Sequence, residues 1–265
     1  MSYLSPQKTI EALIDSGQSK VLASENKLLV SGYLAGTILS LAAAFAISIS
    51  ISTGSTLLGA ALFPVGFIML NLIGVDLLTG IFVTAPLALI DARKGVDLSK
   101  VLSSWLIVFI GNFIGALSVV FLFTFFMTYG FSIDPSAIGV KIAQIGESRT
   151  LGYAQYELAG WASVFVGAIL CNWMVSMGIL GSKISTSVAG KALAMWMPIM
   201  LFFYMGFEHA VVNMFLFPAA LVMGANFTVL DFFLWNEIPV LLGNLFGGLL
   251  LTGLPLYFLY GDKPD

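Results

Sequence analysis

The sequence predicts an all-α polytopic membrane protein, built from an inverted repeat of three plus three transmembrane helices. Of its 265 residues, 59% are hydrophobic and 9% are charged, and the mean hydropathy is +1.00. A soluble domain carries about 25% charged residues, so this composition cannot cover a surface that faces water. The apolar runs are long rather than short and alternating, which favours helices over a β-barrel.

A weak repeat with an offset of 132 residues links the two halves of the chain. The matching positions are Gly74-Val75-Asp76 with Gly206-Phe207-Glu208, Pro86 with Pro218, and Gly111-Asn112 with Gly243-Asn244. Both acids lie inside apolar stretches. Paired interruptions at corresponding places in two halves are a pointer to a transport site near the middle of the membrane.

The apolar stretches set the expected spans, because a transmembrane helix needs roughly 20 apolar residues. We expect spans at about residues 28–51, 57–90, 101–129, 158–181, 191–223 and 237–260. The second and fifth stretches are too long for one straight crossing and contain the interruptions. Each is therefore expected to form two half-helices, joined by a non-helical segment that is buried in protein.

These spans predict one transmembrane domain with short flanking segments. Its expected parts are an amphipathic N-terminal helix within 1–26, the domain at 27–261 with half-repeats at 27–130 and 158–260, an external loop at 131–157 and a tail at 262–265. The helix has a Ser5-Pro6 start and is expected to lie along the membrane surface. No cleavable signal peptide is expected in residues 1–26, and the single cysteine, Cys171, excludes an internal disulfide.

Lysine and arginine predict the orientation. With both termini on one side, that side receives Lys8, Lys20, Lys27, Arg93, Lys94, Lys100, Lys183, Lys191 and Lys263, and the other receives Lys141 and Arg149. Cytoplasmic loops carry the excess of basic residues. The sequence therefore predicts a multi-pass protein of the inner (cell) membrane with both termini in the cytoplasm.

The first interruption places Asp76 and Thr79 between Gly74 and Gly80. Asp76 is expected to play a structural part, accepting backbone N–H bonds at the start of the second half-helix. The Thr79 hydroxyl, one turn further on, either serves a passing solute or bonds back to its own helix.

The second interruption contains Gly206, Glu208 and His209, the only histidine of the protein. An ionisable side chain at bilayer depth is costly and is a functional hypothesis by default, and histidine exchanges protons near neutral pH. Glu208 is expected to satisfy backbone donors in the break. One histidine and one cysteine make a metal site unexpected, and no cofactor is expected.

Four amides lie at membrane depth: Asn112, Asn172, Asn213 and Asn244. Amides commonly bond helices together, and glycines that permit close packing flank Asn112 and Asn244. Asn172 lies outside the repeat, so a role beside the pore stays open for it.

At these residues the chain resembles the formate/nitrite transporter family over nearly its whole length. The resemblance is carried by Phe63-Pro64-Val65-Gly66-Phe67, Asp76-Leu77-Leu78-Thr79-Gly80, Gly111-Asn112, Cys171-Asn172-Trp173-Met174-Val175, Gly206-Phe207-Glu208-His209 and Asn213-Met214-Phe215. It implies an aquaporin-like protomer of six helices. It also implies a homopentamer in which each protomer has its own pore.

The resemblance also implies roles for individual residues. His209 matches the central pore histidine of the family, with Thr79 and Asn172 as its hydrogen-bonding neighbours. The outer hydrophobic constriction corresponds to Phe63, Phe67 and Phe202, and the inner constriction near the cytoplasm corresponds to Leu77, Leu78 and Val175. The break after the first half-helix resembles the family's mobile loop on the cytoplasmic path.

One position departs from the family pattern. Members usually carry a lysine in the outer vestibule, sixteen residues before the asparagine that corresponds to Asn172, and here that position is Tyr156. A tyrosine cannot supply the positive charge that attracts an anion. Arg149 in the same external loop is a candidate substitute.

We therefore expect a channel or transporter for small monovalent anions of weak acids, with formate or nitrite as substrate and protons as a partner. The anion is expected to gain a proton from the His209 network or from water and to cross the hydrophobic pore in near-neutral form. Hydrosulfide, bicarbonate, short monocarboxylates and a neutral solute are the alternatives. Enzymatic activity is not expected, since the chain offers no nucleotide-binding loop or cluster of acids. The other expected partners are membrane lipid and further copies of the chain, and nucleic acid is not expected.

Overall fold

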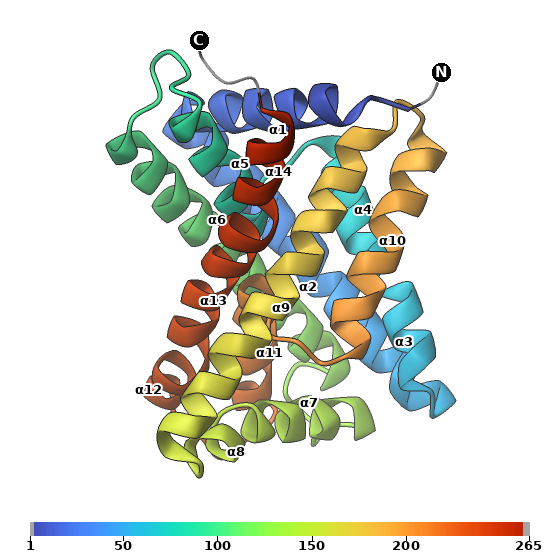
Figure 1. Cartoon of the computed structure of the whole chain (residues 1–265). Helices are drawn as coiled ribbons and strands as arrows, with labels where there is room; N and C mark the ends of the chain where they lie inside the picture. Colours follow the sequence, from blue (N-terminus) through green and yellow to red (C-terminus); the bar gives the residue numbers. More distant parts are fainter. Residues whose placement is uncertain (1–2, 262–265) are drawn as a thin grey trace.

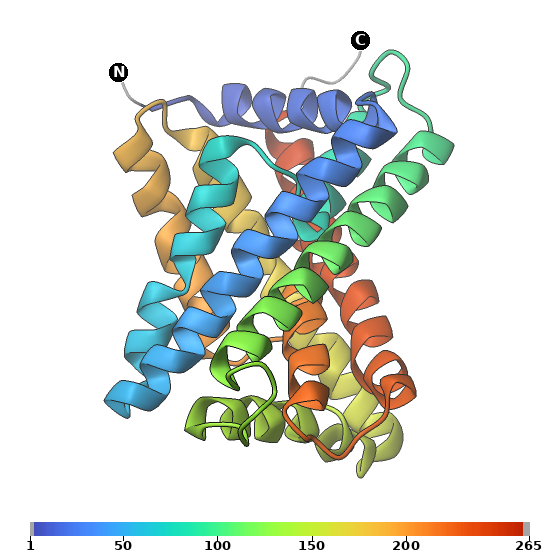
Figure 2. The ribbon, with the colours of Figure 1, turned by 180° about the vertical axis from the view of Figure 1, so that it is seen from behind.

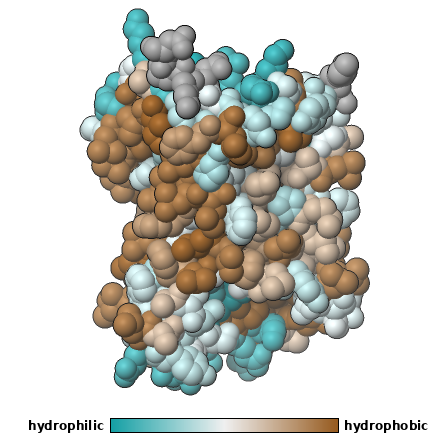
Figure 3. All heavy atoms as spheres, in the orientation of Figure 1, coloured by the Kyte–Doolittle hydropathy of each residue, from teal (hydrophilic) through white to brown (hydrophobic). Residues whose placement is uncertain are grey.

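The described part of the chain, residues 3–261 of a computed structural model, is helical throughout, apart from turns and one isolated bridge between Tyr3 and Ser185. Five stretches are long and apolar enough to cross a membrane. They are Glu25–Thr53 (α2), Thr56–Ile73, Leu98–Met127 (α6), Glu157–Ile184 (α9) and Val229–Tyr260. The second stretch consists of two helices, α3 (Thr56–Leu62) and α4 (Pro64–Ile73). Three shorter apolar helices accompany them: α5 (Leu78–Ile90), α10 (Val188–Tyr204) and α11 (Ala210–Val222). Figure 3 shows a broad hydrophobic belt between two more polar ends.

Both long interrupted stretches are broken where the sequence predicts. The helix α4 ends at Ile73 and α5 begins at Leu78, while α10 ends at Tyr204 and α11 begins at Ala210. Gly74 and Gly206 end the preceding turns with φ of 77° and 70°. These left-handed conformations favour glycine, because it has no Cβ to clash with the carbonyl oxygen.

The last apolar stretch begins earlier and is less regular than expected. It starts at Val229 rather than near residue 237. It consists of α12 (Val229–Phe232), a π-helical turn (Phe233–Glu237), α13 (Ile238–Gly248), a second π-helical turn (Leu249–Gly253) and α14 (Leu254–Tyr260). Each widened turn directly precedes a segment with a proline in its first turn, Pro239 or Pro255. Because proline cannot donate to the preceding turn, a π-turn lets the helix continue without that bond.

The helix α1 (Pro6–Val21) lies across one end of the bundle, as Figures 1 and 2 show. The Ser5 hydroxyl caps it by accepting a bond from the Lys8 N–H. Its apolar residues Ile10, Leu13 and Ile14 are buried, and it packs on α5. Its apolar face is therefore covered by protein, and its position along the membrane surface stays a prediction.

The segment expected as an external loop forms two helices at the other end of the bundle, α7 (Ala137–Ser148) and α8 (Leu151–Ala154). Figure 1 places α7 opposite α1. The helix α7 packs on α11, with Gly146 beside Ala220. We refer to the two ends as the α1 side and the α7 side.

Candidate functional site

The start of α5 is held by the amide of Asn112 in α6. Its Oδ1 accepts the Leu78 N–H at 3.0 Å, and its Nδ2 donates to the carbonyls of Gly32 at 2.8 Å and Asp76 at 3.1 Å. The first N–H groups of a helix have no partner within the helix. The amide therefore satisfies one of them and fixes the break to α2 and α6 at once.

The start of α11 is held in the same way by Asn244 in α13. Its Oδ1 accepts the Ala210 N–H at 3.0 Å, and its Nδ2 donates to the carbonyls of Ala168 at 2.8 Å and Glu208 at 3.0 Å. Asn112 and Asn244 thus make equivalent bonds at the two breaks. Both side chains are fully buried, so these bonds are protected from water.

The acids of the two breaks do not cap the half-helices, contrary to expectation. The Asp76 carboxylate bonds to Lys20 Nζ at 3.0 Å and to the Ser31 hydroxyl at 2.7 Å. That of Glu208 accepts from Asn213 Nδ2 in α11 at 3.1 Å and from Asn236 Nδ2 in the last apolar stretch at 3.3 Å. The amides already serve the backbone donors, so each acid instead ties its break to neighbouring helices.

His209 and Thr79 lie together at the meeting point of the two half-helices. The His209 Nε2 is 3.1 Å from the Thr79 Oγ1, and both residues are buried. Asn172 in α9 bonds through Nδ2 to the Thr79 carbonyl at 3.2 Å and to the Asn244 carbonyl at 2.6 Å. Among residues 3–261 no partner approaches the Asn172 Oδ1. Asn172 therefore neighbours Thr79 directly and His209 only through it.

The ring nitrogens of His209 have distinct partners. The Val212 N–H in α11 donates to Nδ1 at 3.2 Å, so the imidazole caps its own half-helix. A nitrogen that accepts such a bond carries no proton, so in the neutral ring the proton sits on Nε2 and is donated to Thr79. The Thr79 hydroxyl hydrogen then remains available for another acceptor.

Aromatic side chains cover the site on one side. The Phe202 ring stacks on His209 at 5.5 Å between centroids and meets Phe63 edge-on at 5.6 Å. Phe203, which sequence reasoning missed, stacks on Phe63 at 3.9 Å. Phe67 faces Gly178 of α9 instead. Of the three residues expected at the outer constriction, Phe63 and Phe202 are thus in direct contact with each other.

The residues expected at the inner constriction are buried on two elements. Leu77 and Leu78 form the start of α5, and Val175 lies in α9, one turn beyond Asn172. Thr79 follows Leu78 directly. The polar pair of His209 and Thr79 is thus covered by the Phe202 ring and lies next to the buried apolar start of α5 in the sequence.

A cavity of about 270 Å³ adjoins His209 on the α7 side. Two basic side chains line it, Lys141 and Arg149, together with His209 and the aromatic rings of Phe202, Phe203, Tyr204 and Phe207. Tyr156 is 64% exposed and is not part of this lining.

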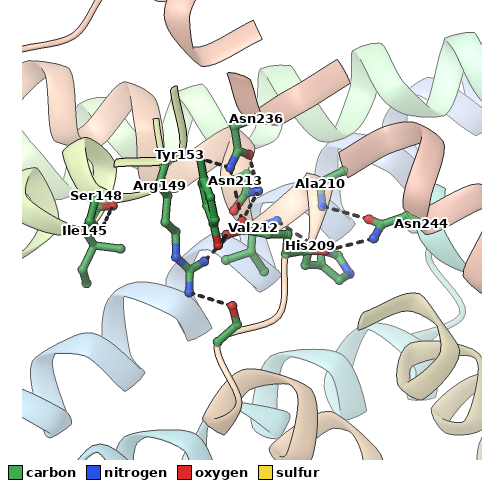
Figure 4. A network of polar contacts seen from close by, with 12 residues as sticks. Ile145, Ser148, Arg149, Tyr153, His209, Ala210, Val212, Asn213, Asn236 and Asn244 are labelled. Carbon is green, nitrogen blue, oxygen red and sulfur yellow. Dashed lines mark hydrogen bonds and ion pairs between the residues drawn. The ribbon is translucent and has the colours of Figure 1, made fainter. Parts of the chain in front are cut away.

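Arg149 lines this cavity and also contacts the second break. Figure 4 shows its side chain next to that of Tyr153. Its guanidinium lies 3.5 Å from the Glu208 carboxylate and donates to the Gly206 carbonyl at 3.3 Å. The Tyr153 hydroxyl lies 3.3 Å from Glu208. Burial, reinforced by the nearby Glu208 charge, raises the pKa of Tyr153 to about 12, so the phenol stays protonated and donates to the carboxylate.

Comparison with known proteins identifies the family. A family model described as formate/nitrite transporter matches residues 7–258. The chain belongs to the formate/nitrite transporter family. This confirms the resemblance and makes the chain a small-anion channel or transporter of the inner membrane with several apolar spans, and not an enzyme.

Individual relatives cover at least 90% of this chain. The uncharacterized transporter YrhG of Bacillus subtilis (strain 168) is 34% identical over 272 residues, covering 100% of this chain and 96% of YrhG. The formate channel BtFdhC of Bacillus thuringiensis is 29% identical over 269 residues, covering 98% and 97%. A solved pentameric formate channel with formate bound has a TM-score of 0.73 at 21% identity, covering 90% of this chain and 98% of that one. The last similarity supports the fold.

Sequence reasoning missed several partners of the site. Ser31, Lys20 and Asn236 hold the acids of the breaks, and Asn236 bonds to both Asn213 at 2.7 Å and Glu208 at 3.3 Å. Asn236 lies next to Glu237 in the last apolar stretch. An adjacent amide and acid at membrane depth were a usable signal, whereas nothing in the spacing of Lys20 pointed to Asp76.

Proposed function

We propose that this protein passes small monovalent weak-acid anions, formate or nitrite, across the membrane in a nearly neutral form. The observation that carries this proposal is the buried contact between His209 and Thr79, which lies among apolar side chains and adjoins a cavity lined by two basic side chains. A hydroxyl that accepts from the ring can donate to an oxygen of the passing acid.

The apolar surroundings explain why a proton is needed. An ion pays several kcal/mol or more to leave water for an apolar constriction. A protonated weak acid avoids most of this cost and needs one donor and one acceptor on its path. The Thr79 hydroxyl offers the donor. The Asn172 Oδ1, which has no hydrogen-bond partner in the described part of the chain, offers the acceptor for the acid's own O–H.

We infer that His209 works as a neutral ring. The sequence alone favoured the histidine network or water as the proton source. In the neutral ring, Nδ1 accepts a hydrogen bond from the Val212 N–H. In a doubly protonated ring Nδ1 would carry a proton of its own, so two donors would face and repel each other. We therefore assign the proton to water in the cavity, and to the imidazole the task of polarising Thr79.

Arg149 and Lys141 are proposed to collect the anion on the α7 side. Both line the cavity, and like charges in a low-dielectric recess raise the local concentration of counter-ions. Arg149 would then supply the charge that Tyr156 cannot, because Tyr156 stands where relatives usually have a lysine.

We also propose a homopentamer, each protomer with its own path, since the matched solved structure is a pentameric formate channel. The α1 side is assigned to the cytoplasm, because it carries most of the lysines and arginines. The apolar belt in Figure 3 is then the surface left for lipid and neighbouring copies.

The test is anion uptake into proteoliposomes across external pH, comparing formate and nitrite with hydrosulfide, bicarbonate, acetate, lactate and a neutral solute. Uptake should rise as external pH falls, by up to about tenfold per unit where the neutral acid is scarce. His209→Asn retains a side-chain acceptor for the cap but does not titrate, so it should keep the rise at a lower rate.

His209→Phe removes both the cap and the donor and should lower uptake further at every pH. A flat pH profile in His209→Asn would assign the proton to the ring and refute the neutral-ring proposal. Uptake of the neutral solute alone, with no anion-dependent flux in the wild type, would refute the anion proposal itself.

A further inference from the structure

A second cavity lies on the α1 side, separate from the site of His209. Its volume is about 240 Å³. Four ammonium groups line it, each from a different helix: Lys20 from α1, Lys27 from α2, Lys183 from α9 and Lys191 from α10. The proposed transport mechanism uses none of them.

The charge of this cavity is largely uncompensated within the described chain. Its one carboxylate, that of Asp76, is engaged by Lys20 at 3.0 Å. Among residues 3–261 no carboxylate lies within ion-pair distance of Lys27, Lys183 or Lys191. Lys20, Lys183 and Lys191 are only partly exposed, so water screens their mutual repulsion incompletely.

We propose that this cavity binds a phosphate group. A monovalent anion neutralises one ammonium, whereas a phosphate offers several acceptor oxygens and up to two charges to groups that converge from several helices. Lysine binds phosphate as a point charge with rotatable donors. The hydroxyls of Ser16 and Ser19 and the amide of Asn71 add uncharged donors to the lining.

Binding would act on the first break. Lys20 joins α1 to Asp76, and Asp76 also bonds to Ser31 through its carboxylate and its backbone N–H. A phosphate among the lysines competes with Asp76 for Lys20. Occupancy is thereby linked to how firmly α1 holds the segment between α4 and α5.

Two sources of the phosphate group fit the location. One is free inorganic phosphate. The other is the headgroup of an acidic lipid such as cardiolipin, because basic pockets between transmembrane helices near the membrane surface suit such headgroups. The two arms of the test separate them.

The first arm uses equilibrium dialysis to measure the binding of radiolabelled inorganic phosphate to the full-length protein, in neutral detergent at constant ionic strength. Binding should saturate in the wild type and weaken at least tenfold in K183Q/K191Q. The matched control K8Q/K94Q removes two charges from the same side but outside the cavity, and should stay within about twofold. K183R/K191R keeps the charges and should retain binding, which excludes misfolding as the cause.

The variant Asp76→Asn should change phosphate affinity in the opposite direction. It removes the competing carboxylate, so phosphate should bind several-fold more tightly. Weaker binding in this variant, provided that it remains folded, would contradict the proposed competition for Lys20. Displacement of labelled phosphate by an equal concentration of formate would show a general monovalent-anion mouth and overturn the proposal.

The second arm compares thermal unfolding in phosphatidylcholine nanodiscs with and without cardiolipin. Stabilisation by cardiolipin in the wild type and in K8Q/K94Q, but not in K183Q/K191Q, assigns the site to a lipid headgroup. Saturable phosphate binding in the first arm without stabilisation by cardiolipin assigns the site to free phosphate. If neither arm shows an effect that depends on Lys183 and Lys191, the proposal is wrong. None of these three outcomes bears on the proposed transport through His209, which the uptake measurements test separately.

Discussion

His209 Nε2 lies 3.1 Å from Thr79 Oγ1, and this contact joins the two halves of the chain at residues that are not equivalent in the repeat. At the offset of 132 residues, His209 corresponds to Leu77 and Thr79 to Val211. The amides Asn112 and Asn244, in contrast, correspond and make equivalent bonds. The scaffold of the breaks is thus symmetric, and the polar pair exists because the symmetry is broken there.

Thr79→Val tests the hydroxyl of this pair. Valine keeps the shape of threonine but cannot accept from His209 or donate to an anion. Losing one hydrogen bond in a dry site costs about 1–1.5 kcal/mol, so formate uptake in proteoliposomes should fall roughly tenfold.

The matched control for this variant is Thr84→Val on the same helix. Thr84 is also buried, but its hydroxyl bonds only to the Gly80 carbonyl of its own helix. Uptake should stay within about twofold of wild type. Equal losses in both variants would mean that packing of α5, and not the Thr79 hydroxyl, limits transport.

Asn112→Leu and Asn244→Leu test the two amide scaffolds. Each change leaves the first backbone N–H of the half-helix and the carbonyl of the break residue, Asp76 or Glu208, without the amide partner. An unsatisfied buried group costs about 1–3 kcal/mol. Each should lower the unfolding temperature in detergent by roughly 5–10 °C.

Asn71→Leu is the control for these variants, because the Asn71 amide bonds only to the Phe67 carbonyl of its own helix and is partly exposed. Its unfolding temperature should change by less than about 2 °C. A large effect of Asn244→Leu together with none of Asn112→Leu would contradict the structural equivalence of the two breaks.

The sequence predicted the breaks well and the partners of their acids poorly, for a physical reason. Glycines and an acid inside an apolar run mark a break wherever they occur, so the start of α5 could be placed near Leu78. Which donor satisfies Asp76 depends instead on tertiary packing: Lys20 reaches it only because α1 folds back onto α5. The π-turns before Pro239 and Pro255 were missed because proline in an apolar run also fits an ordinary kink.

Variants of the ion pair between Arg149 and Glu208 distinguish a structural role of Arg149 from a role in transport. Arg149→Gln leaves the buried Glu208 carboxylate without its countercharge, and the unfolding temperature should fall. Because the Arg149 side chain is 24% exposed, we expect a cost of about 2 kcal/mol, below the range of about 3–5 kcal/mol for fully buried pairs.

The double variant Arg149→Gln/Glu208→Gln removes both charges and should recover most of this stability. It should not recover transport: the half-saturating formate concentration should stay several-fold above wild type, since the cavity retains only Lys141 as a fixed charge. Normal half-saturation in the stable double variant would rule out Arg149 as the residue that collects the anion.

Gly17→Ala tests whether α1 is held by protein. A Cβ at Gly17 would overlap the Thr84 carbonyl oxygen of α5, which is backbone and cannot move aside easily. The variant should loosen α1 and raise hydrogen exchange of residues 6–21 at least tenfold, about 1.4 kcal/mol of local stability. Glu11→Ala, on the exposed face of the same helix, should leave exchange nearly unchanged.

Because Lys20 follows Gly17 by less than one turn, a loosened α1 also draws Lys20 from Asp76, so exchange at residues 74–77 should rise in parallel. A rise confined to α1 would show that Ser31 alone suffices to hold Asp76.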